Sequence, residues 1–249
     1  MSFTKSVGAA GIALLALAAP ASAGSLKDDG GREFSWSVNA AVTSDYIFRG
    51  VSQTDNDPAI SAGFDASYGI LYAGFWASNV DEAISPDNFE IDYYAGIKPV
   101  VGPATFDFGI LYYTYPGKDV PAGEPETVEL KAGVSGEIIP KLSAAAVAYW
   151  SPEAAGNGSE YWVYEGTLAY ALPKFLVFDP TLSGLVGFFD DQDDNSFDYT
   201  YWNAGITFGW DKFAFDFRYW DTDGEDGFEI LNDGLADERF VFTVKLTYP

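Results

Sequence analysis

The sequence of 249 residues predicts an all-β protein, a closed antiparallel transmembrane β-barrel with an up-and-down meander. The strand number that we expect is about twelve. Three observations predict this fold. Apolar and polar residues alternate with a period of two in repeated runs of roughly ten residues, the length with which a tilted strand crosses a bilayer. Short and long connections alternate between these runs, and aromatic residues, which make up 17% of the chain, gather near the ends of the runs.

The first 23 residues have the features of a secretory signal peptide. A lysine precedes an apolar stretch over residues 7–19, and residues 21–23 (Ala-Ser-Ala) form a small-x-small cleavage motif. An N-terminal membrane helix is the alternative, but the stretch is too short to span a bilayer. We therefore expect a cleaved signal peptide over residues 1–23 and a barrel domain over residues 24–249.

The strand pattern is clearest where large apolar residues recur at every second position. Phe213, Phe215 and Phe217 share one face, and Asp216 and Arg218 share the other. Comparable runs occur at residues 34–43, 60–68, 89–97, 105–112, 128–135, 213–219 and 239–248, and weaker ones at 70–79, 141–150, 159–170, 180–189 and 197–209. We expect the apolar faces to contact lipid. Because lipid cannot satisfy backbone polar groups, the last strand must pair with the first.

Most acidic residues of the chain lie in its longer connections. Six longer loops contain 24 of the 37 acidic residues but only two bases, Arg49 and Lys118: residues 45–57, 80–88, 116–126, 151–160, 190–198 and 221–238. Short periplasmic turns and long external loops are typical of outer-membrane barrels. The chain is therefore predicted to lie in the outer membrane of a Gram-negative bacterium, in contact with lipid and lipopolysaccharide. A soluble lipocalin-like binder in the periplasm is the alternative.

Aromatic residues are predicted to form two belts at the lipid–water boundaries. The belt beside the long loops would contain Tyr112, Tyr113, Tyr115, Tyr149, Trp150, Tyr161, Trp162, Tyr164, Phe188, Phe189, Tyr199, Tyr201, Trp202, Tyr219 and Trp220. The other belt would contain Phe34, Trp36, Tyr68, Phe106, Tyr170, Phe208, Trp210 and Tyr248. Tyr94, Tyr113, Tyr161 and Tyr201 also have the inward parity and would narrow the interior.

Composition excludes several kinds of site. The chain has no cysteine and no histidine, which excludes disulfides, thiolate nucleophiles, Ser-His-Asp triads and imidazole metal ligands. The formal net charge is −24, and nucleic-acid binding needs basic residues, so we expect no nucleic-acid partner. No nucleophile elbow or phosphate loop occurs, and we expect the protein not to be an enzyme. An embedded hydrolase is a remote alternative.

A family resemblance is carried by four segments: residues 42–58 (VTSDYIFRGVSQTDNDP), 74–81 (GFWASNVD), 90–96 (EIDYYAG) and 112–117 (YYTYPG). They resemble the TorF-type porin family, also catalogued as the proteobacterial proteins of unknown function called Gcw_chp. The resemblance implies an outer-membrane barrel with a porin role and no known substrate. The last run, residues 240–248, also looks like the terminal signal read by the barrel assembly machinery, although Pro249 follows its final aromatic residue.

The polar faces of the predicted strands direct charged side chains inward. Seven are acids and four are bases: Asp65, Glu90, Asp92, Asp107, Glu129, Glu165 and Asp216, against Lys131, Arg218, Arg239 and Lys245. Rings of acids favour cations. About eight strands leave a filled interior and sixteen to eighteen leave an aqueous channel, so at most a narrow pore follows. We predict a narrow passive channel for small cationic or neutral solutes. The alternative is a closed barrel with a structural or surface-binding role and no conductance.

Two loop features remain open to more than one interpretation. Arg49, the only base in loop 45–57, either folds toward the interior acids as a constriction or ties the loop to carboxylates at the rim. Two acidic clusters could bind calcium, through Asp191 and Asp193 in one, and Asp221, Asp223 and Glu225 in the other. A solvated, repelling loop surface is the alternative. We expect no firm metal site and no cofactor, although divalent cations could bridge these loops to lipopolysaccharide.

Overall fold

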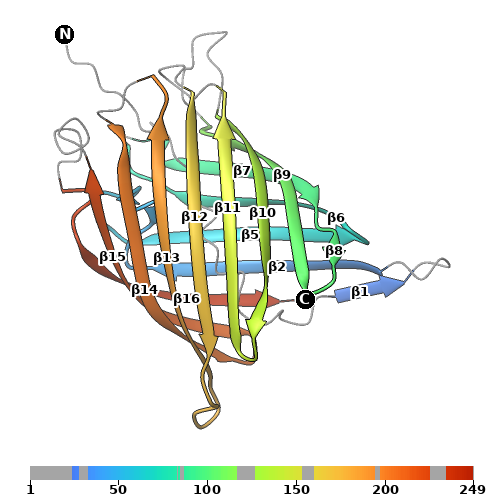
Figure 1. The fold of residues 1–249 in the computed structure, drawn as a ribbon. Helices are drawn as coiled ribbons and strands as arrows, with labels where there is room; N and C mark the ends of the chain where they lie inside the picture. Colours follow the sequence, from blue (N-terminus) through green and yellow to red (C-terminus); the bar gives the residue numbers. More distant parts are fainter. Residues whose placement is uncertain are drawn as a thin grey trace, which may run out of the picture.

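Twelve long antiparallel strands close into a barrel in the computed structural model of the chain (Figure 1). The structure describes residues 24–27, 33–82, 84, 87–116, 127–152, 160–193, 197–224 and 234–248. The barrel strands are β2 (Glu33–Thr43), β5 (Ala59–Tyr68), β6 (Leu71–Asn79), β7 (Phe89–Ile97), β9 (Ala104–Thr114), β10 (Val128–Ile139), β11 (Leu142–Ser151), β12 (Tyr161–Ala171), β13 (Asp179–Asp191), β14 (Tyr199–Trp210), β15 (Phe213–Gly224) and β16 (Arg239–Tyr248). The predicted fold class is confirmed.

Closure joins the first and last strands of the barrel, as the backbone argument requires. β16 pairs with β2 from Thr243 opposite Thr43 to Tyr248 opposite Val38, and β2 pairs with β5 along its other edge. The short strand β1 (Gly24–Lys27) continues the β16 edge by pairing with the start of β2. Each remaining barrel strand pairs with its neighbours in sequence order, so the topology is a meander.

Three short strands accompany β1 and were not predicted. β8 (Val100–Val101) pairs with the start of β9. β3 (Ile47–Phe48) and β4 (Val51–Ser52) form a separate hairpin within the first long loop. The predicted signal peptide lies outside the described residues. No helix in the described part of the chain is long and apolar enough to cross a membrane.

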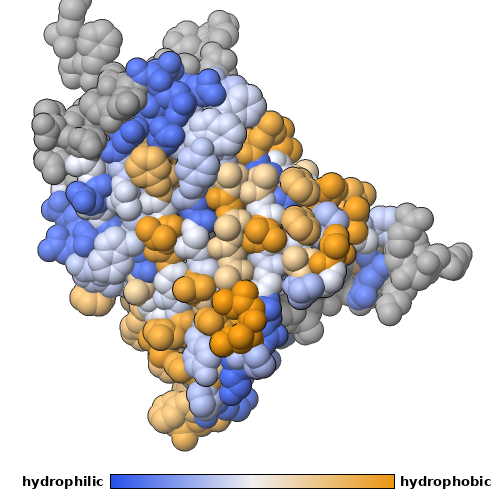
Figure 2. Space-filling view, in the orientation of Figure 1, coloured by the Kyte–Doolittle hydropathy of each residue, from blue (hydrophilic) through white to orange (hydrophobic). Residues whose placement is uncertain are grey.

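The outer wall of the barrel is apolar because the alternation directs one side of each strand outward. On β13, Leu182, Val186 and Phe188 are 51%, 55% and 40% exposed, whereas Phe189 and Asp191 are buried. Apolar residues accordingly cover much of the wall in Figure 2. Such a surface is favourable against lipid and unfavourable against water.

The outer face gives a first testable expectation. Val186→Arg places a charge in the middle of the outer wall, and it should lower the free energy of unfolding by about 2–4 kcal/mol in a bilayer. Urea titration of the protein folded in phospholipid vesicles measures this change. Val186→Leu is the matched control, and an arginine that costs no more than leucine would contradict a lipid-facing wall.

The predicted belt beside the long loops is wrong for about half of its members. Eight of these aromatic side chains are at most 8% exposed and lie inside the barrel: Tyr113, Tyr115, Tyr149, Tyr161, Phe189, Tyr199, Tyr201 and Trp220. The physical reason is parity. Neighbouring residues such as Tyr112 and Tyr113 point to opposite faces of the sheet. Proximity to a strand end therefore gives the height of an aromatic ring along the barrel but does not say whether the ring faces lipid or the interior.

Candidate functional site

The first long loop folds into the barrel. Its hairpin pairs Ile47 with Ser52 and Phe48 with Val51, which leaves Arg49 and Gly50 at the tip with φ of +47° and +84°. Residues 45–50 and 52–54 are all buried. We call residues 45–54 the plug. Gly50 is required where the tip meets the wall, because a Cβ there would lie 2.7 Å from Cβ of Tyr201.

An ion pair at the tip of the plug joins it to the barrel wall. Arg49 Nη1 lies 2.6 Å from Glu129 Oε1, and Nη2 lies 2.9 Å from Oε2. The hydroxyls of Tyr113 and Tyr161 each donate a hydrogen bond of 2.7 Å to the same carboxylate. Glu129 is fully buried on β10. Four donors therefore satisfy a carboxylate that would be costly to bury alone.

The Arg49 guanidinium is also held by aromatic rings. Its Cζ atom lies 4.5 Å from the ring centroid of Phe48 and 4.9 Å from that of Tyr149. Burial alone would lower the pKa of Arg49, but the charge of Glu129 and its hydrogen bonds raise that pKa above the ordinary value. Arg49 therefore stays charged, and ordinary changes of pH do not break the ion pair by deprotonating its guanidinium.

The plug has further anchors near the long-loop rim. Arg239 Nη1 lies 2.8 Å from Asp45 Oδ2, at the start of β16. The Ser52 amide donates to the carbonyl of Leu235 at 2.8 Å, and the Thr222 hydroxyl donates to the carbonyl of Gly50 at 3.0 Å. Contacts on several sides of the barrel therefore fix the plug.

Aromatic rings fill the space around the plug at the level of Glu129. Tyr161 stacks on Phe189 at 4.9 Å between ring centroids, Phe189 stacks on Tyr199 at 5.1 Å, and Tyr199 lies 5.9 Å from Tyr201. The inward direction predicted for Tyr161 and Tyr201 agrees with this stack, whereas the lipid belt predicted for Phe189 and Tyr199 does not. Parity within a strand is the signal that places such rings inside. Phe189, for example, directly follows the exposed Phe188 on β13 and therefore points to the opposite face.

Toward the short turns, the interior holds networks of hydrogen bonds and ion pairs. Asp107 accepts a hydrogen bond of 2.7 Å from the Tyr72 hydroxyl and lies 2.8 Å from Lys131 Nζ. Asp65 accepts hydrogen bonds from the Tyr94 hydroxyl at 2.6 Å and from Asn39 at 3.3 Å. These acids lie on the inward faces of β5 and β9.

A second network lies on β14 and β15. Arg218 Nε lies 3.0 Å from Asp216 Oδ2, and the Arg218 guanidinium donates to Asn203 at 2.6 Å and to Ser183 at 3.0 Å. Lys245 lies nearby on the inward face of β16, opposite Ala214 of β15. The structure thus places the predicted bases inside the barrel, with Arg239 at the rim.

Besides Asp65, three interior acids form no ion pair with a described residue. Glu90 and Asp92 have no exposed surface, and the Tyr115 hydroxyl donates to Glu90 at 3.3 Å. Within the described part of the chain, both oxygens of Asp92 and the Oε2 atom of Glu90 lack a hydrogen-bond partner. Glu165 accepts a hydrogen bond of 2.6 Å from the Tyr201 hydroxyl. Acidic side chains therefore outnumber basic ones along this part of the interior.

Residues 27–248 match a family described as "Bacterial protein of unknown function (Gcw_chp)". The chain belongs to the Gcw_chp family. The resemblance seen in residues 42–58 is thereby confirmed at the family level. The description of the Gcw_chp family gives no activity, so the porin role implied by the TorF-type name stays a prediction.

The Gcw_chp chain also resembles solved porin structures. A KdgM porin superposes with a TM-score of 0.57 at 9% identity, covering 86% of this chain and 98% of that chain. A KdgM porin in complex with disordered oligogalacturonate gives 0.55 at 9% identity, covering 86% and 98%. A NanC porin gives 0.55 at 9% identity, covering 86% and 99%. No curated protein matches the sequence. At this identity the likeness shows that the Gcw_chp chain has the fold of outer-membrane porins.

The calcium candidates of this Gcw_chp protein act in part as turn caps. Asp191 is buried and accepts a hydrogen bond of 3.0 Å from the Asp193 amide, and Asp193 accepts one of 3.0 Å from the Glu160 amide. Asp221 accepts a hydrogen bond of 2.9 Å from the Thr222 amide. Asp223 lies at the end of β15. Glu225 is outside the described residues, which contain no cluster of three or more acids able to hold a metal ion.

Proposed function

We propose that this Gcw_chp protein is a narrow passive channel of the outer membrane, that it passes small cationic or neutral solutes, and that it is not an enzyme. One observation carries the proposal. A closed barrel has a polar, net-acidic interior, and a folded loop occupies the long-loop half of that interior. A polar interior lining suits a hydrated path, and an inserted loop narrows it.

The charge balance of the interior supports the cation preference. Four acids are matched by bases at ion-pair distance: Asp45, Asp107, Glu129 and Asp216 pair with Arg239, Lys131, Arg49 and Arg218. Asp65, Glu90, Asp92 and Glu165 form no ion pair with a described residue, and only Lys245 remains on the basic side. A narrow interior of this kind attracts cations and repels anions.

A closed barrel without conductance is the second candidate. The dense packing around the plug favours it, because Tyr113, Tyr201 and Glu129 are each at most 2% exposed. The two candidates differ in one property, namely whether the plug ever leaves room for ions.

Single-channel recording in planar lipid bilayers tests the proposal. We expect small conductance steps and, under a potassium chloride gradient, a reversal potential of the sign given by a cation-preferring pore. A clear anion preference would contradict the proposed solute class. A folded, inserted protein that gives no steps would favour the closed barrel.

The unpaired interior acids give a sharper expectation. Replacing Asp65, a half-buried acid on the inward face of β5, by Asn removes its carboxylate with little change of shape. The reversal potential under the same gradient should move toward zero. Asp211→Asn, in an exposed short turn, is the matched control and should leave the potential unchanged. An equal shift in both variants would show that the interior acids do not set the preference.

A further inference from the structure

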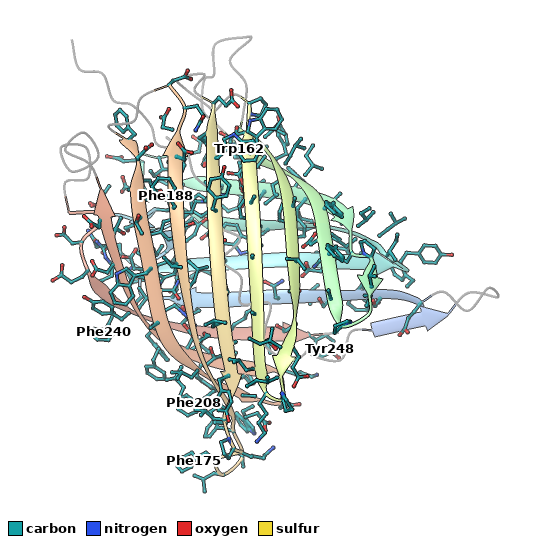
Figure 3. The ribbon with its side chains drawn as sticks, viewed as in Figure 1. Trp162, Phe175, Phe188, Phe208, Phe240 and Tyr248 are labelled. Atoms are coloured by element: carbon teal, nitrogen blue, oxygen red, sulfur yellow. The ribbon has the colours of Figure 1, made fainter. Side chains whose placement is uncertain are left out.

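The turn between β12 and β13 carries an apolar tip. Phe175, Leu176 and Val177 are 59%, 77% and 54% exposed. The turn projects below the neighbouring short turns at the bottom of Figure 1, and Phe175 lies on the projecting part in Figure 3. Three adjacent large apolar side chains at the end of a hairpin are unfavourable in water.

The local backbone does not explain this choice of residues. Phe175 and Phe178 exchange two backbone hydrogen bonds of 3.0 Å and 2.9 Å, which leaves Leu176 and Val177 as a two-residue turn. Leu176 has a φ of +56°. Such turns prefer Asn or Gly, because a bulky side chain is strained at positive φ. The barrel thus keeps an apolar residue at a strained position, which indicates that the apolar side chain itself is useful there.

The apolar surface of the tip is continuous with the outer wall. The Phe178 ring packs edge-on against Phe208, Trp210 and Phe215, with centroids 5.9, 6.5 and 6.3 Å away. Trp210 is 47% exposed on the outer face. Figure 2 shows apolar residues reaching from the lower wall to the tip.

The height of the tip matches the edge of the lipid. Phe188 belongs to the predicted aromatic belt at the long-loop edge of the lipid, and Phe178 has the same parity ten residues away. Ten strand residues that rise about 3.3 Å each and tilt by about 40° span about 25 Å, which is the height of the apolar band of such barrels. Phe178 therefore lies at the opposite edge of this band, and Leu176 lies beyond it, in the adjoining interface. Lys174 and Asp179, 3.2 Å apart and exposed, flank the tip.

We propose that residues 175–178 insert into the periplasmic leaflet and bind phospholipid, with Lys174 facing the headgroup phosphates. The short-turn end of the barrel is the periplasmic end because short turns take that side in such barrels. The contact would anchor the β12–β13 side of the barrel in the interface. It is independent of conduction through the interior.

A single fluorescent label tests the contact, since the chain has no cysteine of its own. Leu176→Cys carries the label at the tip, and Asp211→Cys carries it at the neighbouring short turn as the control. Each protein is folded into phosphatidylethanolamine–phosphatidylglycerol vesicles, and heat-modifiable migration on gels verifies folding. Quenching is measured with aqueous iodide and with a nitroxide near the headgroup end of a lipid chain.

We expect the label at residue 176 to be quenched several-fold more by the lipid nitroxide, and several-fold less by iodide, than the label at residue 211. Equal iodide access at both positions would overturn the proposal. Protection found in native outer membranes but not in vesicles would overturn it in favour of a protein partner. Adding Phe175→Ser and Val177→Ser to the Leu176→Cys protein should return the label to water. A label that stays in lipid would show that the apolar tip is not responsible.

Discussion

Replacing Glu129 with alanine is expected to lower the free energy of unfolding by about 3–5 kcal/mol, the usual cost of leaving a buried charge unpaired. The variant removes the acceptor of two arginine bonds and two tyrosine hydroxyl bonds. Arg49 would then be buried beside aromatic rings without a counter-charge. Urea titration of the folded barrel, followed by tryptophan fluorescence, measures the loss.

Two further variants make that result specific to the ion pair. Glu137→Ala removes an exposed acid from the same strand together with its one hydrogen bond from the Lys141 amide, and should cost only about 1 kcal/mol. Replacing Arg49 and Glu129 together by methionine removes both charges and should recover most of the stability, because a well-packed apolar pair can replace a buried ion pair. A double variant as unstable as Glu129→Ala would show that packing around the plug, and not the unpaired charge, causes the loss.

Replacing Arg49 with glutamine is expected to raise the single-channel conductance or the open probability several-fold. The variant breaks the bidentate contact at the tip of the plug and removes a buried positive charge from the interior. The plug should then leave its position more often, and cations should pass more easily. Bilayer recordings at equal salt on both sides measure this change.

Lysine at position 49 separates the two effects. It keeps the charge but cannot make the planar, two-bond contact of arginine. We expect an intermediate rise in open probability with little change in ion preference. If Arg49→Gln and the unchanged protein gave the same steps and open times, the ion pair would have no part in limiting passage.

The strand positions could be predicted because alternation is a direct consequence of strand geometry. Runs such as 213–219 and 239–248 needed no information from elsewhere in the chain. Closure was predictable as well, since lipid leaves no other partner for the edge strands. Both expectations rest on local pattern and on backbone chemistry, which a single sequence contains.

The plug could be predicted only in part. Arg49 was singled out because it is the only base in its loop, but its partner lies 80 residues away on β10. Many acids compete for one arginine, and sequence spacing does not rank them. Of the eight inward aromatic rings, parity predicts Tyr113, Tyr161 and Tyr201 to face the interior, whereas height alone misplaces the other five.

A reversible link between the plug and the wall tests the central claim most directly. Arg49→Cys and Glu129→Cys can be joined by a short bifunctional thiol reagent and released by a reductant, without other cysteines to interfere. The same channels are recorded before and after reduction. We predict low conductance while the link is intact and a several-fold rise when it is cut. Conductance that stays the same on cutting the link would contradict a plug that limits passage.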